Sequence, residues 1–246
     1  MADAQVVKRP APGTTEAAIL ARDLAVEAIG TFALIFIGAG SIIATGGKDL
    51  VAIAFAHGLA IALMVAATGH FSGGAFNPAV ALALALARKL SLFKTIGYVA
   101  AQLVGAVIAA MLLKAVFPSS LTDQVGLGTP AVGGPFSAGQ AFLAEIITTF
   151  FLAYVIFGVA IDKRGATTIA ALAIGLCITM DILATGAVSG AAMNPARWFG
   201  PALVQNAFAN PWVWILGPAI GAAIAAVVYF YGYMQGREPE ERQRSS

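Results

Sequence analysis

The chain has 246 residues, of which only 26 are charged (14 basic and 12 acidic, or 11%), and its net charge is +2. A soluble domain carries about 25% charged residues; with 59% hydrophobic residues and a mean hydropathy of +0.86, this chain lacks the polar side chains to cover a soluble surface. Disorder is excluded by the same apolar content, the small net charge gives no reason to expect nucleic acid as a partner, and the single cysteine, Cys177, excludes an internal disulfide.

The composition therefore predicts an integral membrane protein, in which a spanning helix takes about 20 mostly apolar residues. The sequence predicts six spans, over 24–45, 51–68, 95–117, 139–161, 167–184 and 212–234. Residues 1–23 and 235–246 are expected to be polar tails and 118–138 an extracytoplasmic connecting loop, and no cleaved signal peptide is expected.

Two shorter apolar segments, 78–87 and 195–205, remain between the spans. Each is about 15 Å long as a helix, half the thickness of a bilayer. Each also begins with proline directly after asparagine, a favoured pair at a helix start. We therefore predict two half-helices that begin at mid-membrane, which is tolerated only where the helix end is buried in protein or lines a water-filled cavity.

The basic residues predict the orientation. With six spans and two re-entrant segments, eleven of them share one face and two, Lys48 and Lys114, lie on the other. Basic residues concentrate on the cytoplasmic side, so both termini are expected in the cytoplasm, in a multi-pass protein of the cell (inner) membrane. The eleven are Lys8, Arg9, Arg22, Arg88, Lys89, Lys94, Lys163, Arg164, Arg237, Arg242 and Arg244.

An internal repeat relates the two halves. Glu-x-x-x-Thr-Phe begins at Glu27 and again at Glu145, and a Ser-Gly-x-x-x-Asn-Pro-Ala segment follows each, with Asn77 50 positions after Glu27 and Asn194 49 after Glu145. Three spans per copy is an odd number, so the second copy must insert upside down. Inverted repeats place a functional site at the midplane, where broken helices meet. The predicted fold is all-α, with six transmembrane helices and two re-entrant half-helices in an inverted three-plus-three repeat, the copies being 24–117 and 139–234.

The paired Asn77-Pro78-Ala79 and Asn194-Pro195-Ala196 boxes in such a repeat resemble the aquaporin family of major intrinsic proteins, over roughly residues 24 to 234. Physically, two facing helix N-termini create a positive potential that repels cations and hydronium. The amides of Asn77 and Asn194 can also donate to a passing water. The alternative is that both asparagines are only helix caps.

The resemblance further implies an outer constriction at His57, Ile182, Ala191 and Arg197, placed by their spacing from the boxes. Many strict water channels have an aromatic residue at the first position and histidine at the second, so this set is more similar to tonoplast intrinsic proteins and ammonia-permeable aquaporins. We therefore expect water, ammonia and hydrogen peroxide to pass. Glycerol facilitators typically carry Asp after the arginine and a basic residue four positions later, where this chain has Trp198 and Ala202; a glycerol or urea facilitator remains the nearest alternative.

Four charges fall at membrane depth: Glu27, Glu145, Asp181 and Arg197. Buried charges in lipid need partners, and the two glutamates can accept the unpaired N–H groups of the re-entrant loops, with Gln102 joining the first. Asp181 could support His57 or the loop before Asn194, or make a purely structural bond.

Other classes are compatible with parts of the pattern. Inverted repeats and buried acids also occur in proton-coupled transporters, which is the alternative from a different class. An enzyme is not expected, because the sequence offers neither a metal cluster nor a nucleophile–base pair; no cofactor or metal is expected either. The family resemblance implies a homotetramer in the lipid bilayer with one pore per subunit.

Overall fold

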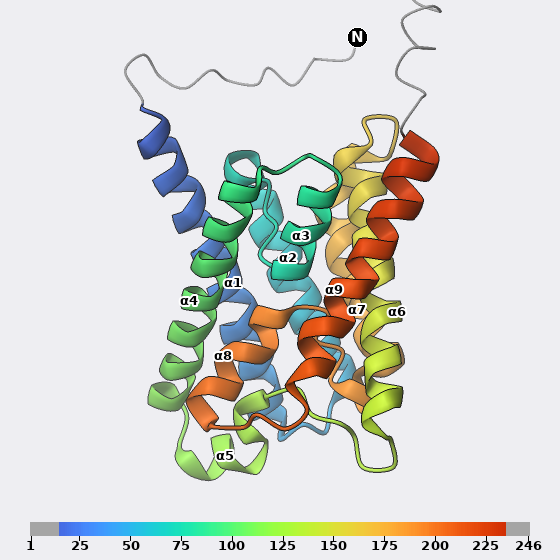
Figure 1. The fold of residues 1–246 in the computed structure, drawn as a ribbon. Coiled ribbons are helices and arrows are strands. Elements are labelled where there is room, and N and C mark those ends of the chain that lie inside the picture. The colour runs from blue at the N-terminus through green and yellow to red at the C-terminus, as the bar shows by residue number, and fades with distance from the viewer. Residues whose placement is uncertain (1–14, 235–246) are drawn as a thin grey trace, which may run out of the picture.

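The computed structural model describes residues 15–234, and within them every regular element is helical (Figure 1). Six helices are long and apolar enough to cross a membrane: Glu16–Thr45, Leu50–Ser72, Leu92–Val116, Ala138–Ile161, Thr167–Ser189 and Pro211–Met234. The elements are α1 (Glu16–Thr45), α2 (Leu50–Ser72), α3 (Pro78–Leu86), α4 (Leu92–Val116), α5 (Ser119–Gln124), η1 (Gly126–Gly128), α6 (Ala138–Ile156), η2 (Phe157–Ile161), η3 (Thr167–Ile169), α7 (Ala170–Ser189), α8 (Pro195–Gln205), α9 (Pro211–Ala225) and η4 (Ala226–Met234).

The predicted spans correspond to these six helices, but three ends differ by at least four residues. Helix α1 begins at Glu16, eight residues before the predicted start, because Thr15 caps it by accepting a 3.2 Å hydrogen bond from the Ala18 N–H. Helices α2 and α7 continue past the predicted ends to Ser72 and Ser189. Hydropathy locates the apolar part of a helix, whereas caps and tertiary partners decide where it stops.

The two half-helices, α3 and α8, occupy opposite halves of the molecule, between α4 and α9 (Figure 1). Each packs extensively against a span of the other repeat: α3 against α9 and α8 against α4. The two repeats are therefore interlocked around one centre rather than placed side by side.

The long helices pack in pairs that follow the repeat. Helix α1 packs against α4 as α6 packs against α9, and α2 packs against α7 across the repeat boundary. Glycine permits the closest approaches: a Cβ on Gly105 would overlap the Ala28 carbonyl, and one on Gly221 would overlap that of Ile146. Such small residues let membrane helices approach closely.

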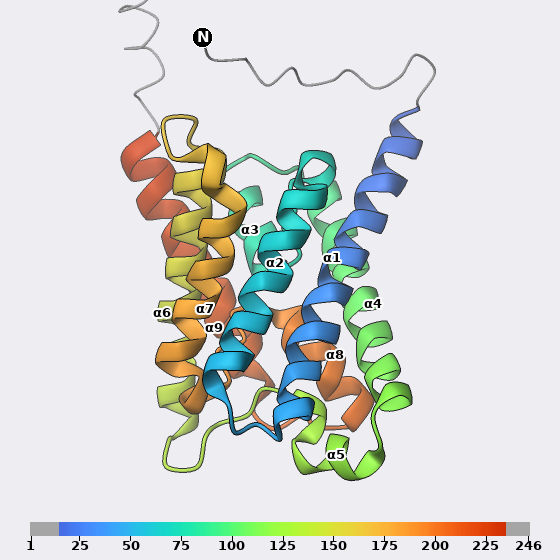
Figure 2. The same ribbon diagram turned by 180° about the vertical axis from the view of Figure 1, so that it is seen from behind.

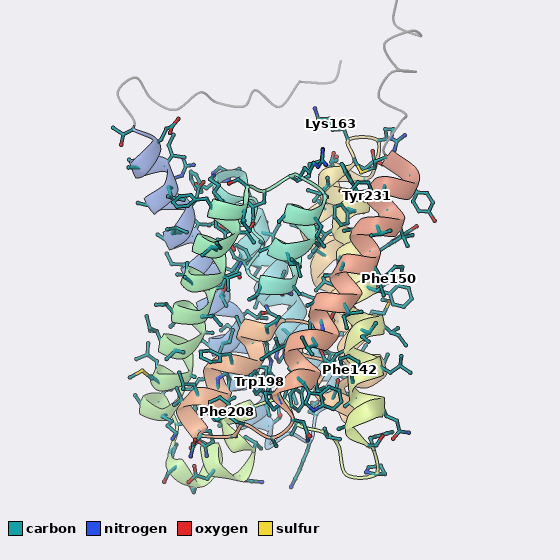
Figure 3. All side chains as sticks on the ribbon, viewed as in Figure 1. Phe142, Phe150, Lys163, Trp198, Phe208 and Tyr231 are labelled. Carbon is teal, nitrogen blue, oxygen red and sulfur yellow. The ribbon has the colours of Figure 1, made fainter. Side chains whose placement is uncertain are left out.

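The described chain begins and ends on the same face, as six crossings require (Figures 1 and 2). Lys163 lies on this face as well (Figure 3). Here Asp23 is buried between two bases, with 2.8 Å contacts to Arg22 and to Lys94. Of the eleven bases used to predict orientation, Lys8, Arg9, Arg237, Arg242 and Arg244 lie outside the described residues.

Candidate pore and selectivity filter

A cavity lies between the two repeats, with walls from α1, α2, α3, α6, η2, α7, α8 and the two re-entrant loops. Its volume is about 70 Å³, and since each water needs roughly 10–15 Å³ by this measure, only a handful of waters fit. Val65, Leu84 and Ile161 line it toward the face that carries Lys163, whereas His57 and Arg197 line it toward the other face. A cavity of this volume can hold a few small molecules between the repeats.

Asn77 and Asn194 lie at the start of the two half-helices and both line the cavity. Each side-chain oxygen caps its own helix: that of Asn77 accepts from the Ala79 N–H at 2.8 Å, and that of Asn194 from the Ala196 N–H at 3.0 Å. Both asparagines are therefore helix caps, as in the alternative interpretation of the sequence.

The side-chain nitrogens of the same asparagines join the two loops. Nδ2 of Asn77 donates to the Met193 carbonyl at 2.7 Å, and Nδ2 of Asn194 donates to the Phe76 carbonyl at 2.9 Å. An amide NH₂ has two hydrogens, so each asparagine keeps a second N–H beyond this contact. Capping thus fixes both amides without exhausting their donors, and the capping and water-binding roles are compatible.

Two buried glutamates hold the re-entrant loops in corresponding ways. Glu27 accepts the backbone N–H groups of Ala75 at 3.1 Å and Phe76 at 2.7 Å. Glu145 accepts those of Ala192 at 2.8 Å and Met193 at 2.7 Å. Backbone groups in a membrane interior must be paired, and these carboxylates supply the acceptors that the interrupted helices lack.

Further donors complete each cluster. Ser72 donates to Glu27 and Ser189 to Glu145, both at 2.7 Å. Gln102 adds a 2.8 Å hydrogen bond from Nε2 to Glu27. Both serines belong to the repeated Ser-Gly segments, so the repeat could have identified them as partners of the two glutamates.

The loops contain backbone strain beside the asparagines. Phe76 and Met193, each directly before its asparagine, have φ values of 47° and 51°, and Ala191 has 42°. A non-glycine residue in this left-handed region costs about 1–3 kcal/mol and persists only where its surroundings hold it. The glutamate bonds to the Phe76 and Met193 N–H groups supply that restraint.

The four residues predicted for the constriction are brought together. His57, Ile182, Ala191 and Arg197 come from α2, α7, the second loop and α8, and all four are buried and line the cavity. Arg197 donates from Nη1 to the Gly128 carbonyl at 2.8 Å. Nδ1 of His57 lies 2.8 Å from the Ile53 carbonyl, a contact in which the ring nitrogen is the donor.

Among the described residues, the half of the cavity toward the Lys163 face has no corresponding polar set. The boxes are 117 positions apart (194 − 77), so the counterpart of Arg197 is residue 80, which is Val80, and Val80 lines the cavity. Among the described residues that line the cavity, the permanent positive charge of Arg197 therefore has no counterpart in the other repeat.

The sequence gives no indication that Gly128 contacts Arg197. It lies in the connecting loop, in η1, beside Leu127 with its φ of 55°, and a Cβ on Gly128 would lie 3.0 Å from that of Ala39. No motif distinguishes this loop, and only the tertiary structure shows that its carbonyl fixes the guanidinium.

Asp181 is placed differently from the other buried charges. Among the described residues, the hydrogen bond recorded for its carboxylate comes from the thiol of Cys177, at 3.5 Å, one turn earlier on α7. His57 instead bonds to the Ile53 carbonyl, and the loop before Asn194 bonds to Glu145, Ser189 and Asn77. The geometry therefore favours a local structural bond over support of the filter.

Trp198 is buried directly after the arginine and stacks on Trp214, with ring centroids 5.8 Å apart. It also makes an edge contact with Phe208, and both residues lie in the half of the molecule that contains α8 (Figure 3). The indole of Trp214 donates to the Ser189 carbonyl at 2.9 Å, as the Tyr98 hydroxyl donates to that of Ser72 at 2.7 Å. These large aromatics pack behind the loops.

An inverted repeat of membrane-spanning helices, two interlocked half-helices and a cavity lined by both re-entrant loops are the features of a membrane channel. Residues 14–229 match the family model described as major intrinsic protein. The chain belongs to this family, the aquaporins, which are channels for water and small solutes.

The relatives include several aquaporin types. The chain is 41% identical to aquaporin TIP4-4 of Zea mays over 233 residues, which cover 90% of this chain and 91% of the relative. It is 39% identical to aquaporin-4 of Mus musculus over 227 residues (89% and 70%) and 42% identical to aquaporin NIP3-1 of Arabidopsis thaliana over 212 (82% and 65%). Among solved structures, the aquaglyceroporin from Plasmodium falciparum matches with a TM-score of 0.81 at 22% identity, covering 91% of this chain and 99% of that one. This last match shows the shared fold.

Proposed function

We propose that this channel passes water, ammonia and hydrogen peroxide and excludes protons and other ions. The observation that carries the proposal is the composition of the outer constriction, in which two polar side chains, His57 and Arg197, line the cavity together with two apolar ones, Ile182 and Ala191.

Ion exclusion follows from the charges along the cavity. The N-termini of α3 and α8 both face its centre, each with a partial positive charge of about half a unit. Arg197 adds a full positive charge farther out and, with its guanidinium held by the Gly128 carbonyl, cannot turn aside freely. A cation would meet both barriers, whereas a neutral molecule meets neither.

Proton exclusion follows from the asparagine pair. The remaining N–H of each amide can donate to a water oxygen at the centre, which turns that water's hydrogens outward along the pore. A water oriented in this way does not accept a proton from its neighbour, so the file is interrupted.

The apolar walls support ammonia and hydrogen peroxide. The side chains of Ile182 and Ala191 offer no hydrogen bond, so a permeant loses its water on that side and must recover partners from the polar side of the constriction, where Arg197 carries five N–H groups. Small neutral molecules that both donate and accept can do so at this site.

A glycerol or urea facilitator of the same fold is the nearest alternative. Against it, Trp198 and Ala202 stand where such channels typically carry an acid and a base, and both are buried. A proton-coupled transporter is the alternative from another class. In such a transporter the buried acids would carry the protons. Glu27 and Glu145, however, each accept at least three hydrogen bonds that hold the loops, which supports a structural role instead.

The decisive experiment is stopped-flow light scattering on proteoliposomes with water, ammonia, glycerol and urea, together with a peroxide-sensitive dye. We expect osmotic water flux without a pH gradient, ammonia and peroxide flux above that of empty vesicles, and little glycerol flux. Glycerol flux comparable to water would overturn the solute assignment, and flux that requires protons would overturn the channel assignment.

His57→Phe tests the constriction itself. A phenyl ring is larger and offers no hydrogen bond, so we expect the ratio of ammonia to water flux to fall. Phe55→Leu, on the same helix at a 42% exposed position, is the matched control. An unchanged ratio in His57→Phe would show that His57 does not set selectivity.

We further propose a homotetramer in the lipid bilayer, with both termini in the cytoplasm of a cell (inner) membrane. The orientation rests on the bases within the described residues that lie on the face where the described chain begins and ends. They are Arg22, Arg88, Lys89, Lys94, Lys163 and Arg164. Mass measurement of the detergent-solubilised protein tests the first point, and accessibility of cysteines placed at Lys163 or Lys48 tests the second.

A further inference from the structure

The imidazole of His57 lies directly against Gly38 of α1. A Cβ built on Gly38 would overlap Cδ2 and Nε2 of the ring and lie 2.8 Å from Cε1. The space occupied by this edge of the ring therefore exists only because residue 38 has no side chain. Gly38 is buried and makes no hydrogen bond to the ring.

Helix α2 cannot retreat from α1 at this level, because its opposite side is in contact with the backbone of α7. A Cβ on Gly58 would overlap the Gly175 carbonyl, and one on Gly175 would overlap that of Gly58. The Thr179 hydroxyl of α7 also lies within hydrogen-bond distance of the Ala54 carbonyl of α2, at 3.3 Å, and of the Gly175 carbonyl of its own helix, at 3.2 Å. The backbone of α2 is thus held against α7, and the position of the His57 ring must be settled by the side chain alone.

The ring is restrained at its other edge as well. Nδ1 lies 2.8 Å from the Ile53 carbonyl of the preceding turn. With one edge bonded to its own helix and the other in the space left by Gly38, the imidazole is held in the wall of the cavity that Ile182 and Arg197 also line.

We propose that Gly38 is a specificity-determining residue, which sets the width of the outer constriction by providing the recess that holds the imidazole of His57. This inference rests on the proposed function of the constriction. A methyl group at position 38 leaves the ring one direction in which to move, toward the pore axis. The ring then breaks its bond to Ile53 and narrows the passage between His57, Ile182 and Arg197.

A double-mutant cycle tests the recess: wild type, Gly38→Ala, His57→Ala, and the double variant. Each is reconstituted and assayed for water, ammonia and hydrogen peroxide flux. We expect Gly38→Ala to lower peroxide permeability about tenfold, equivalent to a barrier higher by about 1.4 kcal/mol, and to lower water permeability less. In the His57→Ala background the same substitution should change all three fluxes less than twofold, because no ring remains to be displaced.

Gly40→Ala is the matched control. It places the same methyl group on the same helix, at a buried position where the nearest atom is Cδ2 of Leu113 at 3.3 Å, a flexible side-chain end. We expect wild-type flux ratios from it. Equal losses from Gly38→Ala with and without His57, or no loss in either background, would overturn the proposal.

Thermal unfolding of the same four proteins separates this proposal from the proposed function. If wild type carries neither ammonia nor peroxide, the proposed function fails. The recess is then tested by stability alone: the decrease in Tm caused by Gly38→Ala must be smaller when His57 is absent. If Gly38→Ala does not insert or fold, the double variant must restore folding, because it removes the ring that the methyl group strikes. Failure of both variants would refute the recess.

Discussion

Replacing Glu145 by glutamine tests how the second re-entrant loop is held. One carboxylate oxygen accepts from Ser189 at 2.7 Å and from Ala192 at 2.8 Å, and the other accepts from the Met193 N–H at 2.7 Å. Glutamine keeps one acceptor oxygen and replaces the other by an NH₂ donor. The Met193 N–H then faces a donor in a site from which water is excluded.

The magnitude follows from that lost bond. A hydrogen bond to a charged group contributes about 1.5–3 kcal/mol, and an unpaired buried donor adds its own penalty. The strained backbone of Met193, at φ 51°, also loses the contact that restrains it. We expect a total destabilisation of about 2–4 kcal/mol, which at about 2–4 °C per kcal/mol for a chain of this size lowers Tm by about 5–15 °C.

The assay is apparent Tm at a fixed scan rate in detergent, paired with osmotic water permeability in proteoliposomes. Glu16→Gln is the control, because Glu16 is exposed in the first turn of α1 and its loss should change stability by less than about 0.5 kcal/mol. Glu27→Gln should lower Tm less than Glu145→Gln. Oε1 of Gln102 has no hydrogen-bond partner among the described residues, so a flipped Gln102 amide can accept from the new NH₂. A Tm change for Glu145→Gln no larger than that for Glu16→Gln would refute the reasoning.

Three further predictions concern residues around the pore. Tyr98→Phe and Trp214→Phe each remove one donor to a loop carbonyl. Each should lower the free energy of unfolding by about 0.5–1.5 kcal/mol, which is measured as a lower Tm. An unchanged Tm in both variants would show that these bonds do not hold the loops. Arg197→Val removes the permanent charge at the constriction and should raise the proton leak, measured with a pH-sensitive dye inside vesicles. A leak equal to that of wild type would place the proton barrier entirely at the asparagines. Asp181→Asn should leave the ratio of ammonia to water flux within about twofold of wild type, because its carboxylate bonds to Cys177 rather than to the filter; a larger change would assign Asp181 to selectivity.

Much of the fold could be predicted because each step rested on a local rule. Apolar length indicated the six spans, and Asn-Pro at residues 77–78 and 194–195 indicated two helix starts. The repeat indicated that Glu27 and Glu145 have equivalent surroundings. Membrane chemistry then required partners for both, because a carboxylate cannot remain unpaired in lipid.

Helix ends were less predictable. The early start of α1 depends on Thr15 as a cap, and Asp23, which made the segment look like a polar tail, is buried between Arg22 and Lys94. A charged residue within a helix looks like a boundary in hydropathy, but partners brought from another helix allow the helix to continue through it.

The sequence by itself determined the membrane class, the six spans, the inverted repeat and the paired asparagines, because these depend on composition and on spacing along one chain. Only the tertiary structure decided which groups restrain the pore. The carbonyl of Gly128 holds Arg197 from a loop without any motif, and Gly38 makes room for His57 across a helix interface. Such contacts depend on backbone atoms and on the absence of a side chain, and neither of these leaves a pattern in the sequence.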